Sequence, residues 1–176
     1  ILGLLLGRLN LTRIYDALKE SVFQSSMIFV IAIGGKLFVN FIALTGMATE
    51  ITQWINTSGV SVMAVMALIV VLYIFLGMFL DPIGIILLTL PLTIPIVEAF
   101  GFSLIWFGVV VIKLLEIGLV TPPIGLNVFV IKSIVGNKIS LEAIFGGVAW
   151  FLLAEMFVLA AILGIPALSL YLTMFI

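Results

Sequence analysis

The feature that most constrains this chain is a break inside a long apolar run, at residues 118–125, which read Gly-Leu-Val-Thr-Pro-Pro-Ile-Gly. Two adjacent prolines remove two backbone donors, and the flanking glycines relax the chain further. A helix that enters through residues 104–117 must therefore end near Thr121, and it can resume only at about Leu126. In hydrocarbon, an opened backbone is tolerated only where protein buries it or where it lines a wet cavity. The sequence therefore predicts a binding site at membrane depth.

Composition assigns the chain to the membrane. Hydrophobic residues make up 65% of the 176 residues, charged residues only 9%, and the mean hydropathy is +1.51. The sequence has no cysteine and no histidine, which excludes disulfides, thiolate metal sites, imidazole relays and Ser-His or Cys-His nucleophiles. A net charge of -1 gives no support for nucleic-acid binding. Several apolar stretches can cross about 30 Å of hydrocarbon at about 1.5 Å per residue, so we predict one all-α integral membrane domain.

Residues 1–21 are expected to precede the transport domain. Because the chain begins without methionine, we interpret it as a segment of a longer protein, with residues 1–7 as the tail of an earlier helix. A short polar run with apolar residues at helical spacing follows, which predicts a separate amphipathic helix at the membrane interface. Its cations are Arg8, Arg13 and Lys19, and the positive-inside rule places them in the cytoplasm.

Residues 22–176 are predicted to form the membrane transport domain. Residues 22–44 provide a first span that contains Lys36, for which a snorkelling or structurally paired cation is favoured over a substrate contact. Residues 47–58 carry polar groups and no basic residue, which fits an interfacial segment on the outer side. The chain then has to return into the membrane.

The next segment, residues 60–100, allows two interpretations. It is either a pair of spanning helices or a re-entrant hairpin whose tip, at residues 77–82, stops inside the membrane. A cytoplasmic loop should attract Lys or Arg, yet none occurs between Lys36 and Lys113, and the only charge at the turn is Asp81. This pattern favours the re-entrant hairpin.

The remaining sequence predicts a discontinuous crossing over residues 104–135 and a last span over residues 139–163. Lys132 and Lys138 mark its cytoplasmic side. Residues 168–176 would finish on the outer side.

Individual polar residues have structural and functional interpretations. Thr121 adds a hydroxyl at one break and Asp81 a carboxylate at the other, but the prolines suit a simple kink and Asp81 suits a helix cap. Two breaks within about forty residues favour a transporter site, since paired interrupted segments mark such sites. Lys113 and Glu116 should pair on one helix face, and Glu155 is expected to contact a neighbouring helix.

These motifs resemble the C-terminal half of the large membrane subunit of TRAP (tripartite ATP-independent periplasmic) transporters. The resemblance runs from about residue 9 to the end of the chain and rests on a Gly-x-x-Thr-Pro-Pro-x-Gly core with an upstream aspartate pattern. The matching residues are 77–81, Pro91, Pro95, 101–102, 107–108 and 116–127.

The resemblance implies an elevator-type secondary transporter, of which this chain holds the second of two inverted repeats. Such proteins use Na+ as the coupling ion to import organic acids, such as C4-dicarboxylates or sialic acid, across the bacterial inner membrane. The implied partners are a small membrane subunit, a periplasmic substrate-binding protein, the N-terminal half of the same subunit and the lipid bilayer. By this resemblance, sodium is expected at Gly77, Asp81, Gly118 and Thr121, and substrate at Thr121, Pro122, Pro123, Gly125 and Asn127.

Two other functions are weighed against transport. A non-transporting membrane scaffold would keep both breaks dry and packed. An intramembrane enzyme would need Glu116 and Glu155 to converge, because the sequence offers no other paired carboxylates. We therefore expect a transporter and no enzyme.

Overall fold

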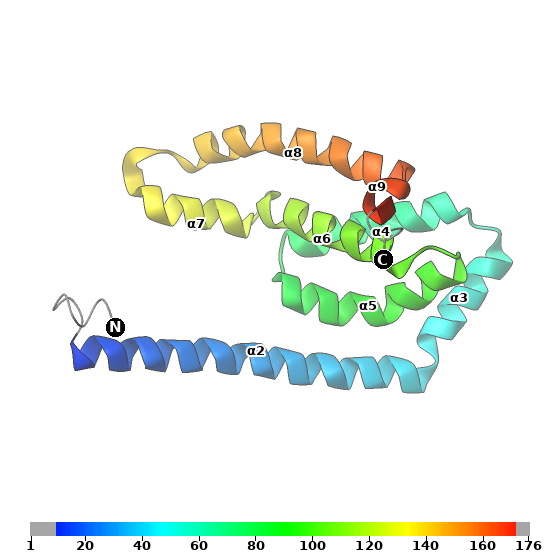
Figure 1. Cartoon of the computed structure of the whole chain (residues 1–176), viewed down its shortest axis with the longest axis horizontal. Helices are drawn as coiled ribbons and strands as arrows, with labels where there is room; N and C mark the ends of the chain where they lie inside the picture. The colour runs from blue at the N-terminus through cyan, green and yellow to red at the C-terminus, as the bar shows by residue number, and fades with distance from the viewer. Residues whose placement is uncertain (1–9, 172–176) are drawn as a thin grey trace.

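The structure is a computed structural model and describes residues 10–171. All regular elements in this part of the chain are helical (Figure 1). In chain order they are α2 (Leu11–Thr45), α3 (Met47–Ser58), α4 (Val62–Gly77), α5 (Pro82–Ala99), α6 (Leu104–Val120), α7 (Leu126–Val135), the short η1 (Gly136–Lys138), α8 (Leu141–Gly164) and α9 (Ala167–Leu170).

Most of the helices lie roughly along one common direction, and α3 runs obliquely between α2 and α4 (Figure 1). The long helix α2 runs along one side and α8 along the other, with α4, α5 and α6 between them. Helix α7 continues the line of α6 after the break. The turn between α4 and α5 lies beside this break and well short of the end at which α2 begins (Figure 1).

The core lies between α4, α5 and α6. Its largest fully buried side chains include Tyr73, Trp106 and Phe107. The Tyr73 ring packs edge-on against Phe107, with ring centroids 6.4 Å apart. The Tyr73 hydroxyl lies 2.6 Å from Thr89 Oγ1 and 3.3 Å from Thr93 Oγ1, so the two helices of the α4–α5 hairpin share a buried hydrogen-bond cluster. A buried polar cluster of this kind fixes how two apolar helices pack.

The outer helices have the character of membrane spans. In the described part of the chain, three helices are long and apolar enough to cross a membrane: Leu11–Thr45, Pro82–Ala99 and Leu141–Gly164. Of the side chains on α8, only Ile144 and Leu159 are buried, and α2 buries only Gly35 and Ile42. Helices that are apolar on nearly every side are typical of lipid contact. The chain is therefore an all-α protein of the integral membrane class.

The predicted separate amphipathic helix before residue 22 is wrong. Residues 11–45 form one continuous helix, capped at its start by the Asn10 side chain, which accepts a hydrogen bond from the Arg13 amide at 2.9 Å. No proline or glycine follows until Gly34, so nothing stops the helix near residue 21. At about 1.5 Å per residue, α2 is about 52 Å long. The predictions for residues 1–7, for Arg8 and for residues 172–176 lie outside the described residues.

Basic residues do share one end of the molecule. Arg13 and Lys19 lie in the first turns of α2, and Lys132 and Lys138 lie at the connection from α7 to α8, which is at the same end in Figure 1. The opposite end carries Glu50 on α3 and Glu98 at the end of α5. The predicted clustering of cations at one end is therefore confirmed.

Candidate functional site

The two breaks predicted from the sequence meet in space. Helices α4 and α6 run in the same direction, and their C-terminal ends touch at Gly77 and Gly118, both buried (Figure 1). A Cβ built on Gly118 would lie 2.6 Å from the Gly77 Cα, and one built on Gly77 would lie 2.8 Å from the Gly118 Cα. Only glycine at both positions permits this backbone contact. The contact places the end of α4 against the end of α6.

The first break is a capped turn. The α4 carbonyls of Ile74, Phe75 and Leu76 accept hydrogen bonds from the amides of residues 78–80. Asp81 caps α5: its Oδ1 accepts a hydrogen bond from the Gly84 amide at 3.0 Å, with Pro82 at the first helical position. The helix-cap interpretation of Asp81 is thus confirmed, and whether its charge acts on an ion stays a prediction.

The second break is where the sequence predicts it. Helix α6 ends at Val120 and α7 begins at Leu126. Thr121 makes two hydrogen bonds to the last turn of α6. Its amide donates to the Gly118 carbonyl at 3.1 Å, and its hydroxyl donates to the Ile117 carbonyl at 2.6 Å. The lone pairs of that hydroxyl oxygen remain able to accept a cation.

Several backbone groups at the breaks have no hydrogen-bond partner. A helix leaves its last four carbonyls without intrahelical partners. Within the described residues, no hydrogen bond reaches the carbonyls of Gly77, Leu119 or Val120. The N-cap of α7 is Gly125, in the left-handed region with φ 59°, and no side chain of residues 10–171 caps the first amides of this helix. The region thus holds unpaired carbonyls of α4 and α6 and open amides of α7.

Helix dipoles give these groups opposite preferences. A helix C-terminus carries about half a negative charge and an N-terminus about half a positive charge. Two C-termini, those of α4 and α6, meet at the Gly77–Gly118 contact, which favours a cation there. The N-terminus of α7, only a few residues along the chain, favours an anion such as a carboxylate.

The candidate ligand atoms around the two breaks are oxygens, which suit a hard cation such as Na+. They come from the carbonyls of Gly77, Leu119 and Val120 and the hydroxyl of Thr121. Among the described residues, no group of three or more His, Cys, Asp or Glu side chains lies close enough to hold a metal ion. Any ion here would therefore be bound mainly by the opened backbone.

The remaining predicted site residues lie around the second break. Pro122 and Pro123, joined by a cis peptide bond, are exposed, and so is Asn127 in the first turn of α7. Gly125 is buried against Phe145 of α8: a Cβ at Gly125 would lie 3.1 Å from Phe145 Cε1. No ligand contact of these residues is tested by the structure, so their substrate-binding role stays a prediction.

Three charged residues gather between α6 and α8. The Lys113 Nζ lies 2.8 Å from Glu116 Oε2 and 2.6 Å from Glu155 Oε2. The predicted pair of Lys113 with Glu116 and the predicted contact of Glu155 with a neighbouring helix are both confirmed. The Glu155 contact is an ion pair without hydrogen-bond alignment. The two carboxylates therefore do converge, but on the lysine that lies between them.

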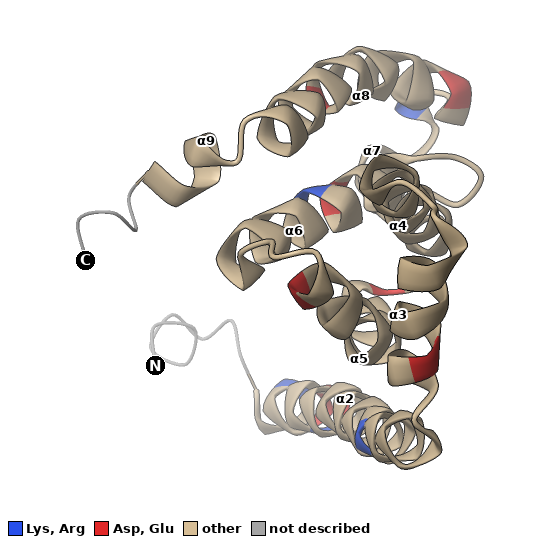
Figure 2. Cartoon of the chain, turned by 90° about the vertical axis from the view of Figure 1, so that its right-hand side faces the viewer, with Lys and Arg blue, Asp and Glu red and all other residues tan. Residues whose placement is uncertain are grey.

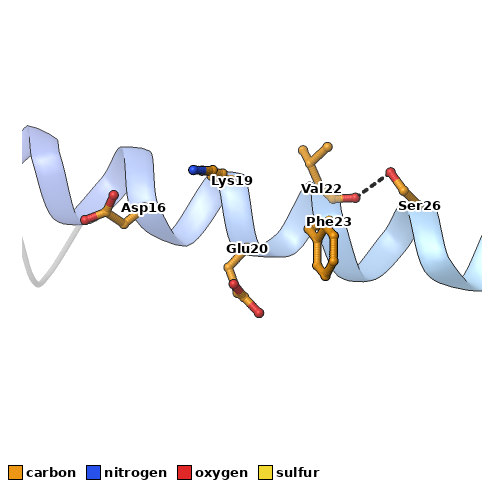
Figure 3. A pocket seen from close by; sticks show the side chains of 6 residues that line it. All are labelled: Asp16, Lys19, Glu20, Val22, Phe23 and Ser26. Carbon is orange, nitrogen blue, oxygen red and sulfur yellow. Dashed lines mark hydrogen bonds between the residues drawn. The ribbon is translucent and has the colours of Figure 1, made fainter.

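Two other polar regions lie on α2. Asp16, Lys19 and Glu20 line a hollow along the first turns of α2, and all six side chains that line it belong to this one helix (Figure 3). Lys36 is exposed on α2 and forms no salt bridge with any of residues 10–171, so its role stays a prediction. Neither region brings a second element to its polar groups.

Three features of the site were not predicted from the sequence: the free main-chain carbonyls, the Phe145 contact and the α4–α6 contact. The free carbonyls of Leu119 and Val120 belong to residues that look like ordinary helix interior. Phe145 belongs to no motif of the sequence, and its contact with Gly125 joins residues that are twenty positions apart. A glycine at the end of each of two parallel helices was the available signal for the α4–α6 contact, but parallel packing is not visible in a single sequence.

Comparisons with known proteins all identify one family of transporters. The family model described as "Tripartite ATP-independent periplasmic transporter, DctM component" matches residues 1–168. The chain is 28% identical over 162 residues to the C4-dicarboxylate TRAP transporter large permease protein DctM of Pseudomonas aeruginosa, which covers 92% of this chain and 38% of that protein. It is 29% identical over 164 residues to the sialic acid TRAP transporter large permease protein SiaM of Vibrio cholerae, covering 93% of this chain and 38% of that protein.

A third relative is named for a different substrate. The isethionate TRAP transporter permease protein DctMQ of Oleidesulfovibrio alaskensis is 30% identical over 142 residues, covering 78% of this chain and 22% of that protein. The chain thus spans less than half the length of these curated relatives. All three are transporter permeases rather than enzymes, and their names differ in substrate.

Proposed function

Since the chain belongs to the DctM family of tripartite ATP-independent periplasmic transporters, we propose that it forms the second inverted repeat of the large membrane subunit of a sodium-coupled organic-acid importer. The substrate class is a carboxylate such as a C4-dicarboxylate or sialic acid, as the names of two relatives suggest. The observation that carries this proposal is the backbone contact of Gly77 with Gly118, which joins two helix breaks at one place.

The proposed ion site lies at that contact. Sodium is bound by unpaired carbonyls of Gly77, Leu119 and Val120 and by the hydroxyl oxygen of Thr121. Main-chain oxygens provide the ligands because a break in hydrocarbon leaves them without other partners. Asp81 contributes by capping the tip that holds Gly77 in place.

The proposed substrate site lies beside it. The open amides of the first turn of α7, with Pro122, Pro123, Gly125 and Asn127 around them, receive a carboxylate. Sodium at the end of α6 adds positive charge next to that carboxylate, so the bound ion strengthens anion binding. This electrostatic link is the physical basis for coupling in the proposal.

The proposal also includes how the chain sits in the membrane. The α4–α5 hairpin is re-entrant, with its tip near the middle of the bilayer, because the tip lies beside the α6–α7 break rather than at an end of the molecule (Figure 1). The end with Arg13, Lys19, Lys132 and Lys138 faces the cytoplasm of a bacterial inner membrane. The rest of the subunit, a small membrane subunit and a periplasmic binding protein complete the transporter, which works by an elevator motion.

Uptake by the full complex tests this proposal. Thr121→Ala should lower the apparent sodium affinity, while Gly108→Ala on the same helix serves as a matched control, because nothing lies within 4 Å of a Cβ added at Gly108. Uptake without any sodium dependence in the parent complex would contradict the proposal.

Thiol labelling separates this proposal from a non-transporting scaffold. Cysteines introduced at Val120 and Ile124 should react with aqueous reagents, and added sodium should slow that reaction. A scaffold predicts dry breaks, so resistance to labelling with or without sodium would favour the scaffold.

A further inference from the structure

We propose that α8 sets the angle between the two half-helices α6 and α7, with Glu155 and Phe145 as positioning residues for the break. The structural part of this inference stands alone, and its effect on sodium rests on the function proposed above. Figure 1 shows α8 lying alongside both α6 and α7.

Helix α7 depends on α8 for its position. Within residues 10–171, α7 contacts only α6, η1 and α8, and of these α6 and η1 are its own neighbours in the chain. Within the described residues, residues 122–124 between α6 and α7 make no backbone hydrogen bond, so no such bond fixes the angle between the two half-helices. Helix α8 is therefore the only other helix in this part of the chain that can hold α7.

Two polar contacts attach α8 to α6. Lys113 pairs with Glu155 at 2.6 Å, and Trp106 Nε1 donates to the Ile162 carbonyl at 2.9 Å. Trp106 precedes Lys113 by seven residues, and Glu155 precedes Ile162 by seven, so both contacts lie on one face of each helix, two turns apart. This spacing fixes the register of two antiparallel helices. Figure 2 shows the charged positions of α6 and α8 on neighbouring helices.

A different kind of contact attaches α8 to α7. The Phe145 ring lies against Gly125, the residue from which α7 starts. Lys132 stabilises the connection from α7 to α8. Its ammonium donates to the carbonyls of Gly136 and Ile139, each at 2.7 Å. The N-terminal end of α8 thus contacts α7, and its middle and C-terminal end contact α6.

Packing and polar contacts have to hold α8 against its neighbours. In a membrane no hydrophobic force drives one apolar helix onto another, so packing and polar contacts have to do so. Helix α8 buries few side chains, and the Lys113 side chain is only 20% exposed. Losing the Glu155 carboxylate removes the central attachment of α8 to α6.

The chain supplies a matched control for this contact. Glu116 pairs with the same Lys113 ammonium at 2.8 Å, but both residues lie on α6. Glu155→Gln and Glu116→Gln therefore remove the same charge from the same cation, and only the first weakens a link between helices.

Spin-label distances in the full complex test the inference. Labels replace the exposed Ile112 on α6 and Ile131 on α7, and their distance distribution is measured in both variants. Glu155→Gln should broaden or shift the distribution, and Glu116→Gln should leave it as in the parent. The charge exchange Lys113→Glu with Glu155→Lys should restore it, which also guards against misfolding of the single variant. Equal distributions in the two single variants would overturn the inference.

Sodium titration of the same variants then tests the link to function. Glu155→Gln should weaken sodium affinity by roughly three- to tenfold, in the range of coupling through neighbouring contacts, while Glu116→Gln should not. A changed distance with unchanged sodium affinity would support the positioning role and contradict the proposed sodium site instead.

Discussion

The two helix breaks of this chain differ in how they treat their exposed backbone. At the turn from α4 to α5, amides of residues 78–80 cap the end of α4 and Asp81 caps the start of α5. At the turn from α6 to α7, Thr121 satisfies the carbonyls of Ile117 and Gly118, and no side chain among the described residues caps the first amides of α7.

This difference separates a structural turn from a candidate binding turn. The capped break pairs the last α4 carbonyls before Gly77 through its own hydrogen bonds and leaves the Gly77 carbonyl unpaired beside Gly118 of α6. The open break keeps free carbonyls on one side and free amides on the other, which an ion and an anion can satisfy. In the proposed function, the first break therefore mainly positions the Gly77 carbonyl, and the second break supplies most of the binding groups.

Gly118→Ala should break this arrangement most strongly. The new Cβ would lie 2.6 Å from the Gly77 Cα, and a backbone atom cannot move aside without shifting a helix. We expect a loss of stability of about 1–3 kcal/mol or more, as for overpacked cores, and loss of transport. Thermal unfolding of the purified complex and uptake measure the two effects. Gly108→Ala should leave both unchanged, and equal behaviour of the two variants would disprove the close contact.

Substitutions of Asp81 test whether its carboxylate only caps α5 or also belongs to the ion site. Asp81→Ala removes the cap on the Gly84 amide and should cost about 1 kcal/mol of stability, whereas Asp81→Asn keeps a capping oxygen and should cost little. Unfolding and sodium titration are measured for both. If Asp81→Asn keeps its stability but loses sodium affinity, the carboxylate charge belongs to the ion site and the distinction between the breaks fails.

Tyr73→Phe should have a smaller effect, confined to the hairpin. The Thr89 hydroxyl still donates to the Ile85 carbonyl and the Thr93 hydroxyl to the Thr89 carbonyl, so only the shared tyrosine hydroxyl is lost. We expect about 0.5–1.5 kcal/mol lower stability and unchanged sodium affinity. A change in sodium affinity larger than the change in stability would show that the hairpin interior is coupled to the site.

Local chemistry made the breaks predictable from the sequence. Adjacent prolines forbid a helix through Pro122 and Pro123, and an aspartate followed by proline favours a helix start at Pro82. The predicted helix boundaries at both breaks therefore agree with the structure within about two residues. The amphipathic helix before residue 22 was predicted wrongly for the converse reason. A change in polarity does not end a helix when no residue stops its hydrogen bonds.

Tertiary contacts limited what the sequence revealed about the site. The contact of Gly77 with Gly118 joins two helices and depends on their parallel packing. The partner of Glu155 was predicted only as a neighbouring helix, because no pattern within α8 identifies Lys113. Residues that act through main-chain carbonyls, such as Leu119, carry no side-chain signal at all.

Sodium binding to the full complex with Thr121→Val and Thr121→Ser shows whether the Thr121 hydroxyl is a sodium ligand. Valine keeps the shape of threonine but lacks the hydroxyl that lies at the end of α6, and serine keeps that hydroxyl. The account predicts that Thr121→Val binds sodium about tenfold or more weakly, equivalent to about 1.4 kcal/mol, while Thr121→Ser stays within about twofold of the parent. Parent-like sodium affinity in Thr121→Val would contradict it.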